Sequence, residues 1–107
     1  MTITDQCQKF ELRRQSDELV YTFVRTMRGN DGSAYKRQDG DYWIINRPDW
    51  GWVAWDEADQ SCTGRPWNVL PRDQGDYPPE GEWVSRKGAK SYVYGLVYVE
   101  LEVTGPL

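Results

Sequence analysis

The acid–base chemistry open to this chain depends on carboxylates, because it contains 17 Asp and Glu residues and no histidine. Without histidine, a Ser-His-Asp or Cys-His catalytic site is impossible. Glycoside hydrolysis needs only two carboxylates across the scissile bond, and Asp56, Glu57 and Asp59 stand close in sequence to tryptophans that could stack on a sugar. Acids at this spacing are also typical of solvated loops. We favour that interpretation and assign no catalytic residue.

The sequence offers no convincing ligand set for a metal or a cofactor. Cys7 and Cys62 are too few and too far apart for a thiolate zinc site. The segments 30–32 and 39–41 carry oxygen ligands for calcium, but neither continues into a twelve-residue loop that ends in Glu. Nucleotide-binding glycine patterns are absent. We therefore expect neither metal nor cofactor, and turn formation explains both acidic segments.

Aromatic residues are the main candidates for binding, since the chain has 6 Trp, 7 Tyr and 2 Phe. Large rings can build a core in a chain whose mean hydropathy is −0.82, and exposed Trp and Tyr are enriched at binding hot spots. Trp50, which lies beside a turn, is the best candidate for exposure. The expected surface is lined by Trp50, Trp52, Trp67 and Tyr77, with Asp56, Asp59 and Arg65 setting its polarity.

The charge balance favours a basic partner over nucleic acid. The chain has 13 Lys and Arg against 17 Asp and Glu, a net charge of −4, with a pI of about 4.8. Attraction to phosphates supplies much of nucleic-acid affinity, so an acidic chain is a poor candidate for that function. Residues 39–82 contain three Lys and Arg and ten Asp and Glu, a net of −7.

Apolar alternation at short spacing predicts a single domain over residues 1–107 that is all-β and mainly antiparallel. A meander, a curved sheet, a small barrel or a sandwich would fit this pattern. Residues 56–77 are expected to form one long ordered loop, and Gly95 is expected to cause a bulge or bend in the last strand. That strand could lie at a sheet edge and pair with a second copy. The expected strands are residues 9–14, 19–28, 34–38, 42–45, 51–55, 82–86 and 91–104.

Residues 35–99 resemble a small Trp-rich β module found in larger, mostly eukaryotic, multidomain proteins. The resemblance covers Tyr42-Trp43-Ile44-Ile45, Gly51-Trp52-Val53-Ala54, Pro66-Trp67 and Pro78-Pro79-Glu80-Gly81-Glu82-Trp83. It implies a compact β unit without an agreed activity, so it assigns no functional residue. A chain that carries this pattern almost alone is more typical of a small bacterial or mobile-element product.

The first residues show no pattern of a signal peptide. The sequence contains no apolar run of about 20 residues that could span a membrane. We therefore expect a cytoplasmic protein without membrane contact. Cys7 and Cys62 permit a disulfide without requiring one, and we favour two free thiols.

Three functions remain open at this point. The first is a non-enzymatic binding protein whose ligand is a protein segment or a small molecule. The second is an acidic inhibitor or immunity-type protein that acts on a basic target. The third is a small carbohydrate-active enzyme that uses two carboxylates.

Overall fold

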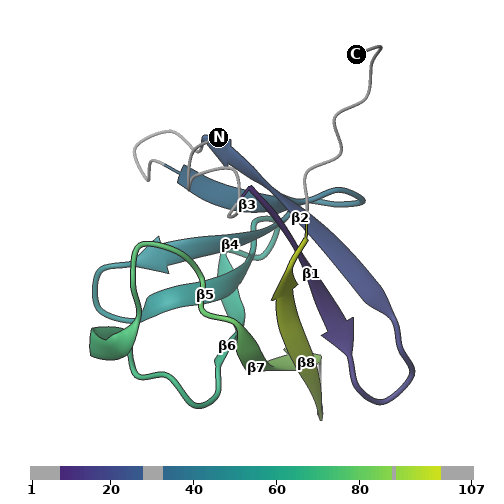
Figure 1. Cartoon of the computed structure of the whole chain (residues 1–107). Helices are drawn as coiled ribbons and strands as arrows, with labels where there is room; N and C mark the ends of the chain where they lie inside the picture. Colours follow the sequence, from purple (N-terminus) through teal and green to yellow (C-terminus); the bar gives the residue numbers. More distant parts are fainter. Residues whose placement is uncertain (1–7, 28–32, 88, 100–107) are drawn as a thin grey trace.

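Eight antiparallel strands close into a barrel in the computed structural model, which describes residues 8–27, 33–87 and 89–99 (Figure 1). The strands follow one another in chain order, and the last pairs with the first. The all-β, antiparallel prediction is therefore confirmed. The strands are β1 (Lys9–Arg14), β2 (Val20–Met27), β3 (Ser33–Arg37), β4 (Tyr42–Arg47), β5 (Gly51–Asp56), β6 (Ser61–Pro66), β7 (Gly81–Lys87) and β8 (Lys90–Tyr98), with a 3-10 turn, η3 (Pro71–Asp73), between β6 and β7.

Alternation along each strand sends every second side chain into the barrel. On β1, Phe10 lies opposite Phe23 of β2 and Tyr98 of β8, and Leu12 lies two residues further along. Phe10 stacks on Phe23 with ring centroids 5.2 Å apart. The buried interior cluster is made of Phe10, Leu12, Phe23, Tyr35, Ile44, Trp52, Trp83, Tyr94 and Leu96.

A second, smaller cluster lies on the outer face of the barrel. Ala34, Ile45 and Val53 are buried there and pack against Trp43 and Trp55. Each of the first three is the chain neighbour of an interior residue, so alternation places it on the opposite face of the sheet. Much of the aromatic content therefore serves packing on both faces of the barrel wall.

The prediction of one long loop over residues 56–77 is wrong in part, because strand β6 forms within it. Gly64 of β6 lies so close to β7 that a β carbon there would come 2.7 Å from the Val84 carbonyl oxygen. Pro66, which donates no backbone hydrogen bond, stands at the end of the strand opposite Trp83. The strand is held by pairing with β5 and β7, since its own residues show little β propensity.

The expectation of a bulge at Gly95 is also wrong. Gly95 keeps regular register with Arg13 on one side and Glu82 on the other. The irregularity lies instead between Ala54 and Trp55, where β5 faces β6. Strand β8 pairs with β7 over Lys90–Leu96 and with β1 over Tyr94–Tyr98, so it is not the edge strand that we considered for a dimer. The expected extension to residue 104 lies outside the described residues.

The segment of residues 67–80 packs against one end of the barrel and holds the core rings there. The Trp52 indole Nε1 donates to the Gly75 carbonyl oxygen at 3.2 Å, and the Trp83 Nε1 donates to that of Pro79 at 2.9 Å. The Tyr98 hydroxyl donates to the Pro78 carbonyl oxygen at 2.6 Å. These hydrogen bonds fix this end of the barrel.

Candidate functional site

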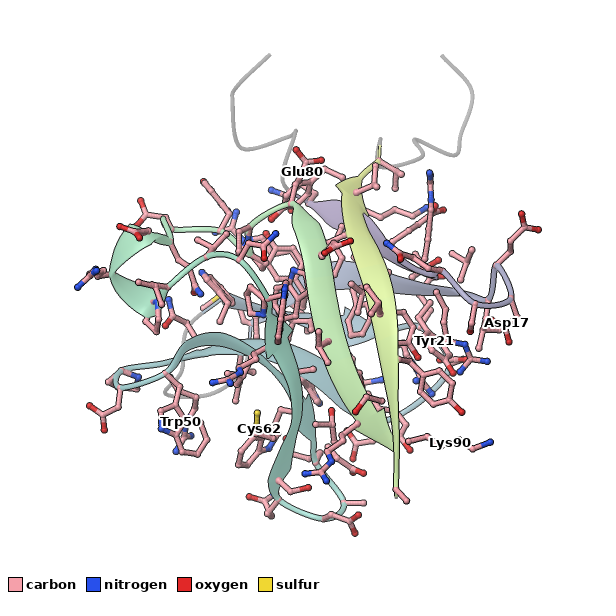
Figure 2. All side chains as sticks on the ribbon, turned by 90° about the horizontal axis from the view of Figure 1, so that it is seen from below. Asp17, Tyr21, Trp50, Cys62, Glu80 and Lys90 are labelled. Atoms are coloured by element: carbon pink, nitrogen blue, oxygen red, sulfur yellow. The ribbon has the colours of Figure 1, made fainter. Side chains whose placement is uncertain are left out.

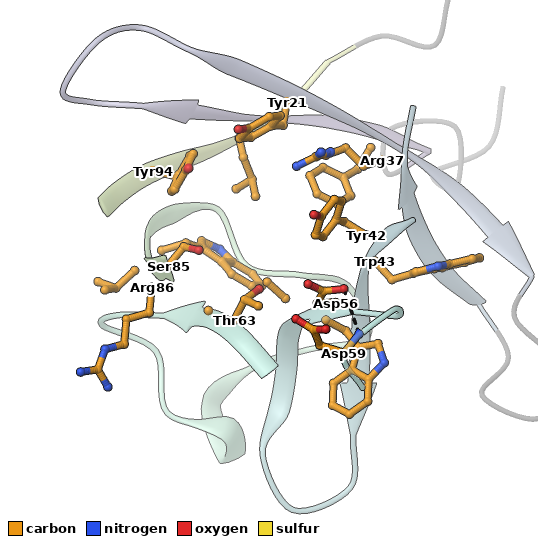
Figure 3. Close-up of a pocket in the computed structure, with 17 residues that line it drawn as sticks. Tyr21, Arg37, Tyr42, Trp43, Asp56, Asp59, Thr63, Ser85, Arg86 and Tyr94 are labelled. Atoms are coloured by element: carbon orange, nitrogen blue, oxygen red, sulfur yellow. Dashed lines mark hydrogen bonds between the residues drawn. The ribbon is translucent and has the colours of Figure 1, made fainter. Parts of the chain in front are cut away.

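A cavity of about 270 Å³ opens at the end of the barrel where β1, β3, β5 and β7 finish, and we call it the mouth cavity (Figure 3). Short turns connect the strands at this end, whereas the long 67–80 segment lies at the other. The mouth cavity is lined by residues of all three burial classes. The buried ones are Leu12, Phe23, Gly64, Trp83 and Tyr94, and the exposed ones are Tyr42, Asp59 and Arg86. The half-buried ones are Tyr21, Arg37, Trp43, Ala54, Trp55, Asp56, Thr63, Val84 and Ser85.

The floor of the mouth cavity is apolar because it is formed by side chains of the barrel core. Phe23, Trp83 and Tyr94 belong to the interior cluster, and Ala54 packs against it. The small side chain of Ala54 leaves room beside these rings. Aromatic walls with a few polar groups at the entrance are the usual composition of a small-molecule site.

Arg37 is clamped at the entrance between two tyrosines. Its guanidinium carbon lies 4.2 Å from the ring centroid of Tyr21 and 4.1 Å from that of Tyr42. The Arg37 Nε donates to a carboxylate oxygen of Asp39. Gly40 leaves space for this arrangement, since a β carbon there would lie 3.2 Å from the Arg37 Nη2. The Arg37 side chain is 18% exposed.

Two carboxylates stand on the β5–β6 turn at the same entrance. The Asp56 Oδ1 accepts hydrogen bonds from the backbone N–H groups of Ala58 at 3.0 Å and Asp59 at 3.3 Å. This contact is typical of an Asx turn and explains why Asp stands at the end of β5. Figure 3 shows both carboxylates together, on the other side of Tyr42 from Arg37. They approach the cavity from a single turn rather than from two sides.

The structure divides the surface that the sequence predicted. Asp56 and Asp59 line the mouth cavity, but Trp50 and Trp52 lie at the opposite end of β5. Trp52 is 3% exposed and belongs to the core, so it does not line a surface. Trp50 is 54% exposed, as expected of a residue beside a turn. Figure 2 shows Trp50 on the other side of the barrel from Tyr21.

The other predicted residues are also away from the mouth cavity. Trp67 is 64% exposed and directly follows β6. Tyr77 is half-buried in the 67–80 segment, with the Arg25 guanidinium 5.8 Å from its ring centroid. Arg65 is exposed on β6. These three residues do not join Asp56 and Asp59 in one site.

The surface predicted from sequence left out most of the polar and aromatic groups that line the cavity, namely Tyr21, Arg37, Tyr42, Thr63, Ser85 and Tyr94. One signal was present, because the expected tight turn at Asp39-Gly40 places Arg37 and Tyr42 on neighbouring strands at equal distance from it. The contributions of β2, β6, β7 and β8 depend on barrel closure. No short motif encodes that closure.

The described part of the chain adds three observations about other sites. It contains no group of three or more Cys, Asp or Glu side chains that could hold a metal ion. It contains no helix long and apolar enough to cross a membrane. Cys62 is exposed and forms no disulfide with a described residue, and Cys7, the other cysteine, lies outside the described residues.

No family model, curated protein or solved structure matches this chain. Function must therefore be argued from the geometry of the barrel.

Proposed function

We propose that this protein is a non-enzymatic binding protein that holds a small molecule in the mouth cavity. One observation carries the proposal: the 67–80 segment packs at one end of the barrel, and a cavity of about 270 Å³ with aromatic walls and a polar entrance opens at the other. A barrel of about eight strands has an interior that side chains can fill or that can hold one small ligand. Here the rings fill the barrel core and leave the mouth cavity at one end.

The size and lining of the cavity define the ligand in outline. Small-molecule sites usually enclose roughly 300–1,000 Å³, so this cavity of about 270 Å³ suits a compound of about one ring with a short chain. Phe23, Trp83 and Tyr94 would cover its apolar body, and the polar groups at the entrance would meet its polar end. A folded protein segment would be too bulky for such a space.

The placement of the carboxylates supports binding over glycoside hydrolysis. Hydrolysis requires two carboxyl groups on either side of the scissile bond. Asp56 and Asp59 come from one turn, and the Asp56 Oδ1 accepts a hydrogen bond from the Asp59 backbone. They are better placed to set the polarity of an entrance than to attack a sugar from two sides.

The experiment is a screen of small aromatic and aliphatic compounds followed by backbone amide NMR. We expect hits to shift the amides of Thr63, Ser85 and Tyr94 at the mouth cavity. Filling the cavity by Ala54→Leu should abolish these shifts while the protein remains folded. Ala58→Leu is the matched control, because Ala58 is exposed on the β5–β6 turn and does not line the cavity.

Two results would contradict the proposal. One is a set of hits whose shifts gather around Trp50 and Trp67 and survive Ala54→Leu. The other is turnover of a glycoside that Asp56→Asn abolishes.

A further inference from the structure

We infer that the ligand of the mouth cavity carries a carboxylate, which the terminal amino groups of Arg37 bind side by side. This inference rests on the proposed function and adds the chemical class of the ligand. It follows from the state of the Arg37 side chain, which is mostly buried and fixed in position, yet has donors still unused.

Two tyrosine rings flank the Arg37 guanidinium. The ring centroids of Tyr21 and Tyr42 lie 4.2 Å and 4.1 Å from its central carbon. Contacts with aromatic rings hold the guanidinium in place and lower its exposure to water. The nitrogen edge is therefore the part of Arg37 at which we expect an occupant of the cavity to bind.

That edge is where the hydrogen-bonding capacity remains. The Nε is engaged by Asp39. Within the described chain, the two terminal amino groups of Arg37 donate to no other residue. The side chain as a whole is 18% exposed, so protein covers most of it. Figure 3 shows the guanidinium pointing into the cavity between Tyr21 and Tyr42. A hydrogen-bond acceptor on the ligand would therefore meet the unused donors of its terminal amino groups.

A carboxylate fits this edge better than other acceptors do. Its two oxygens match the two parallel N–H groups that a guanidinium presents, and such paired, charge-assisted hydrogen bonds are stronger than neutral ones. Because stacking already fixes the Arg37 guanidinium, little side-chain entropy is lost on binding. The ligand is therefore expected to gain both affinity and a fixed orientation from this contact.

Asp56 and Asp59 then set the orientation of the bound carboxylate. Their carboxylates enter from the β5–β6 turn and repel an anion placed beside them. Arg86 also lines the cavity, but its guanidinium points away from it in Figure 3. The anionic end must therefore lie toward β3, with the apolar body over Phe23 and Trp83. A ligand with one carboxylate is favoured over one with two.

The test compares three probes of matched shape on the wild-type protein: 3-phenylpropionate, 3-phenylpropionamide and 3-phenylpropylamine. Affinities come from NMR titration of the mouth amides at low ionic strength. We expect the carboxylate to bind about tenfold more tightly than the amide, the gain of one charge-assisted pair. The amine should bind more weakly than the carboxylate.

Variants locate the effect. Arg37→Lys keeps the charge and loses the paired donors, so it should remove most of the preference for the carboxylate over the amide. Asp56→Asn and Asp59→Asn should each tighten binding of the carboxylate, because they remove a repelling charge. Arg72→Gln is the matched control, since it removes one positive charge from η3, outside the mouth cavity, and should change nothing.

Each alternative outcome decides something. Strongest binding by the amine, weakened by Asp56→Asn, would overturn the inference and leave the proposed function standing. The same holds if neutral compounds from the screen bind at the mouth while 3-phenylpropionate does not. If no compound of any charge shifts the mouth amides, both proposals fail. The probe comparison uses only the wild-type chain, so it remains valid even if Arg37→Lys proves unstable.

Discussion

Arg37 and Tyr42 stack across the tight turn at residues 38–41, with the guanidinium carbon 4.1 Å from the ring centroid. The contact joins the end of β3 to the start of β4, where only two residue pairs hold the strands in register. It also places the charged end of Arg37 at the mouth cavity. The contact that holds the β3–β4 turn therefore also positions Arg37, the candidate binding group.

The contact between β6 and β7 gives the first prediction. A β carbon at Gly64 would lie 2.7 Å from the Val84 carbonyl oxygen and 3.1 Å from the Ser85 Cα, and this backbone cannot move without parting the strands. Gly64→Ala should therefore lower the free energy of unfolding by about 2–3 kcal/mol, as other overpacked sites do. Urea unfolding followed by tryptophan fluorescence measures it.

Gly95→Ala is the matched control in this measurement. Gly95 also lies in a paired strand, but a β carbon there would have no neighbour within 4 Å in the described part of the chain. Alanine should stabilise the strand by about 0.5–1 kcal/mol, because glycine loses more backbone entropy on folding. Equal effects at the two positions would show that Gly64 is not the close contact described above.

The strands were predictable from sequence wherever alternation was strong. Residues 9–14 alternate cleanly between apolar and charged side chains, and β1 spans the same six residues. Residues 61–66 contain glycine and proline and show no such alternation, so β6 was missed. Its conformation is imposed by the neighbours β5 and β7, which sequence pattern alone does not reveal.

The candidate site was less predictable, because it depends on which end of the barrel is open. Trp52 and Asp56 are four residues apart in the sequence, which made them look like parts of one surface. Along an extended strand that spacing amounts to roughly 13 Å, enough to carry Asp56 to the mouth cavity while Trp52 stays near Gly75. Closure of the barrel and packing of the 67–80 segment therefore determine which of these residues lines the cavity and which lies in the core.

The indole nitrogens of Trp52 and Trp55 differ in a way that unfolding measurements can detect. Trp52 Nε1 donates to the Gly75 carbonyl oxygen, whereas Trp55 Nε1 is buried without a hydrogen-bond partner among the residues that the structure describes. Replacing Trp52 by Phe leaves a carbonyl unpaired, while replacing Trp55 by Phe removes an unsatisfied donor. We expect Trp52→Phe to cost about 1–2 kcal/mol more in unfolding free energy. An equal or larger cost at Trp55 would indicate that its indole nitrogen has an acceptor.

An ion pair in the β1–β2 turn should make the free energy of unfolding decrease as the pH falls through the acid range. The Arg14 Nε and Nη2 donate to the Asp17 carboxylate at 2.8 Å and 2.6 Å, and this hydrogen bonding lowers the Asp17 pKa from 3.8 to about 2. Because the folded-state pKa lies below the unfolded value, the stabilisation is complete above 3.8 and disappears as the pH falls through about 2. Asp17 is exposed, so the effect is small and weakens with salt.

Asp17→Asn tests this expectation when unfolding is measured at low ionic strength across the acid range. The variant should be less stable than wild type near neutral pH and approach it as the pH falls toward 2, since protonated Asp17 no longer accepts two charge-assisted hydrogen bonds. Asp49→Asn, an exposed acid in the β4–β5 turn, should show no matching convergence. If the gap between Asp17→Asn and wild type were constant throughout the range, the Arg14–Asp17 pair would not be the source of acid sensitivity.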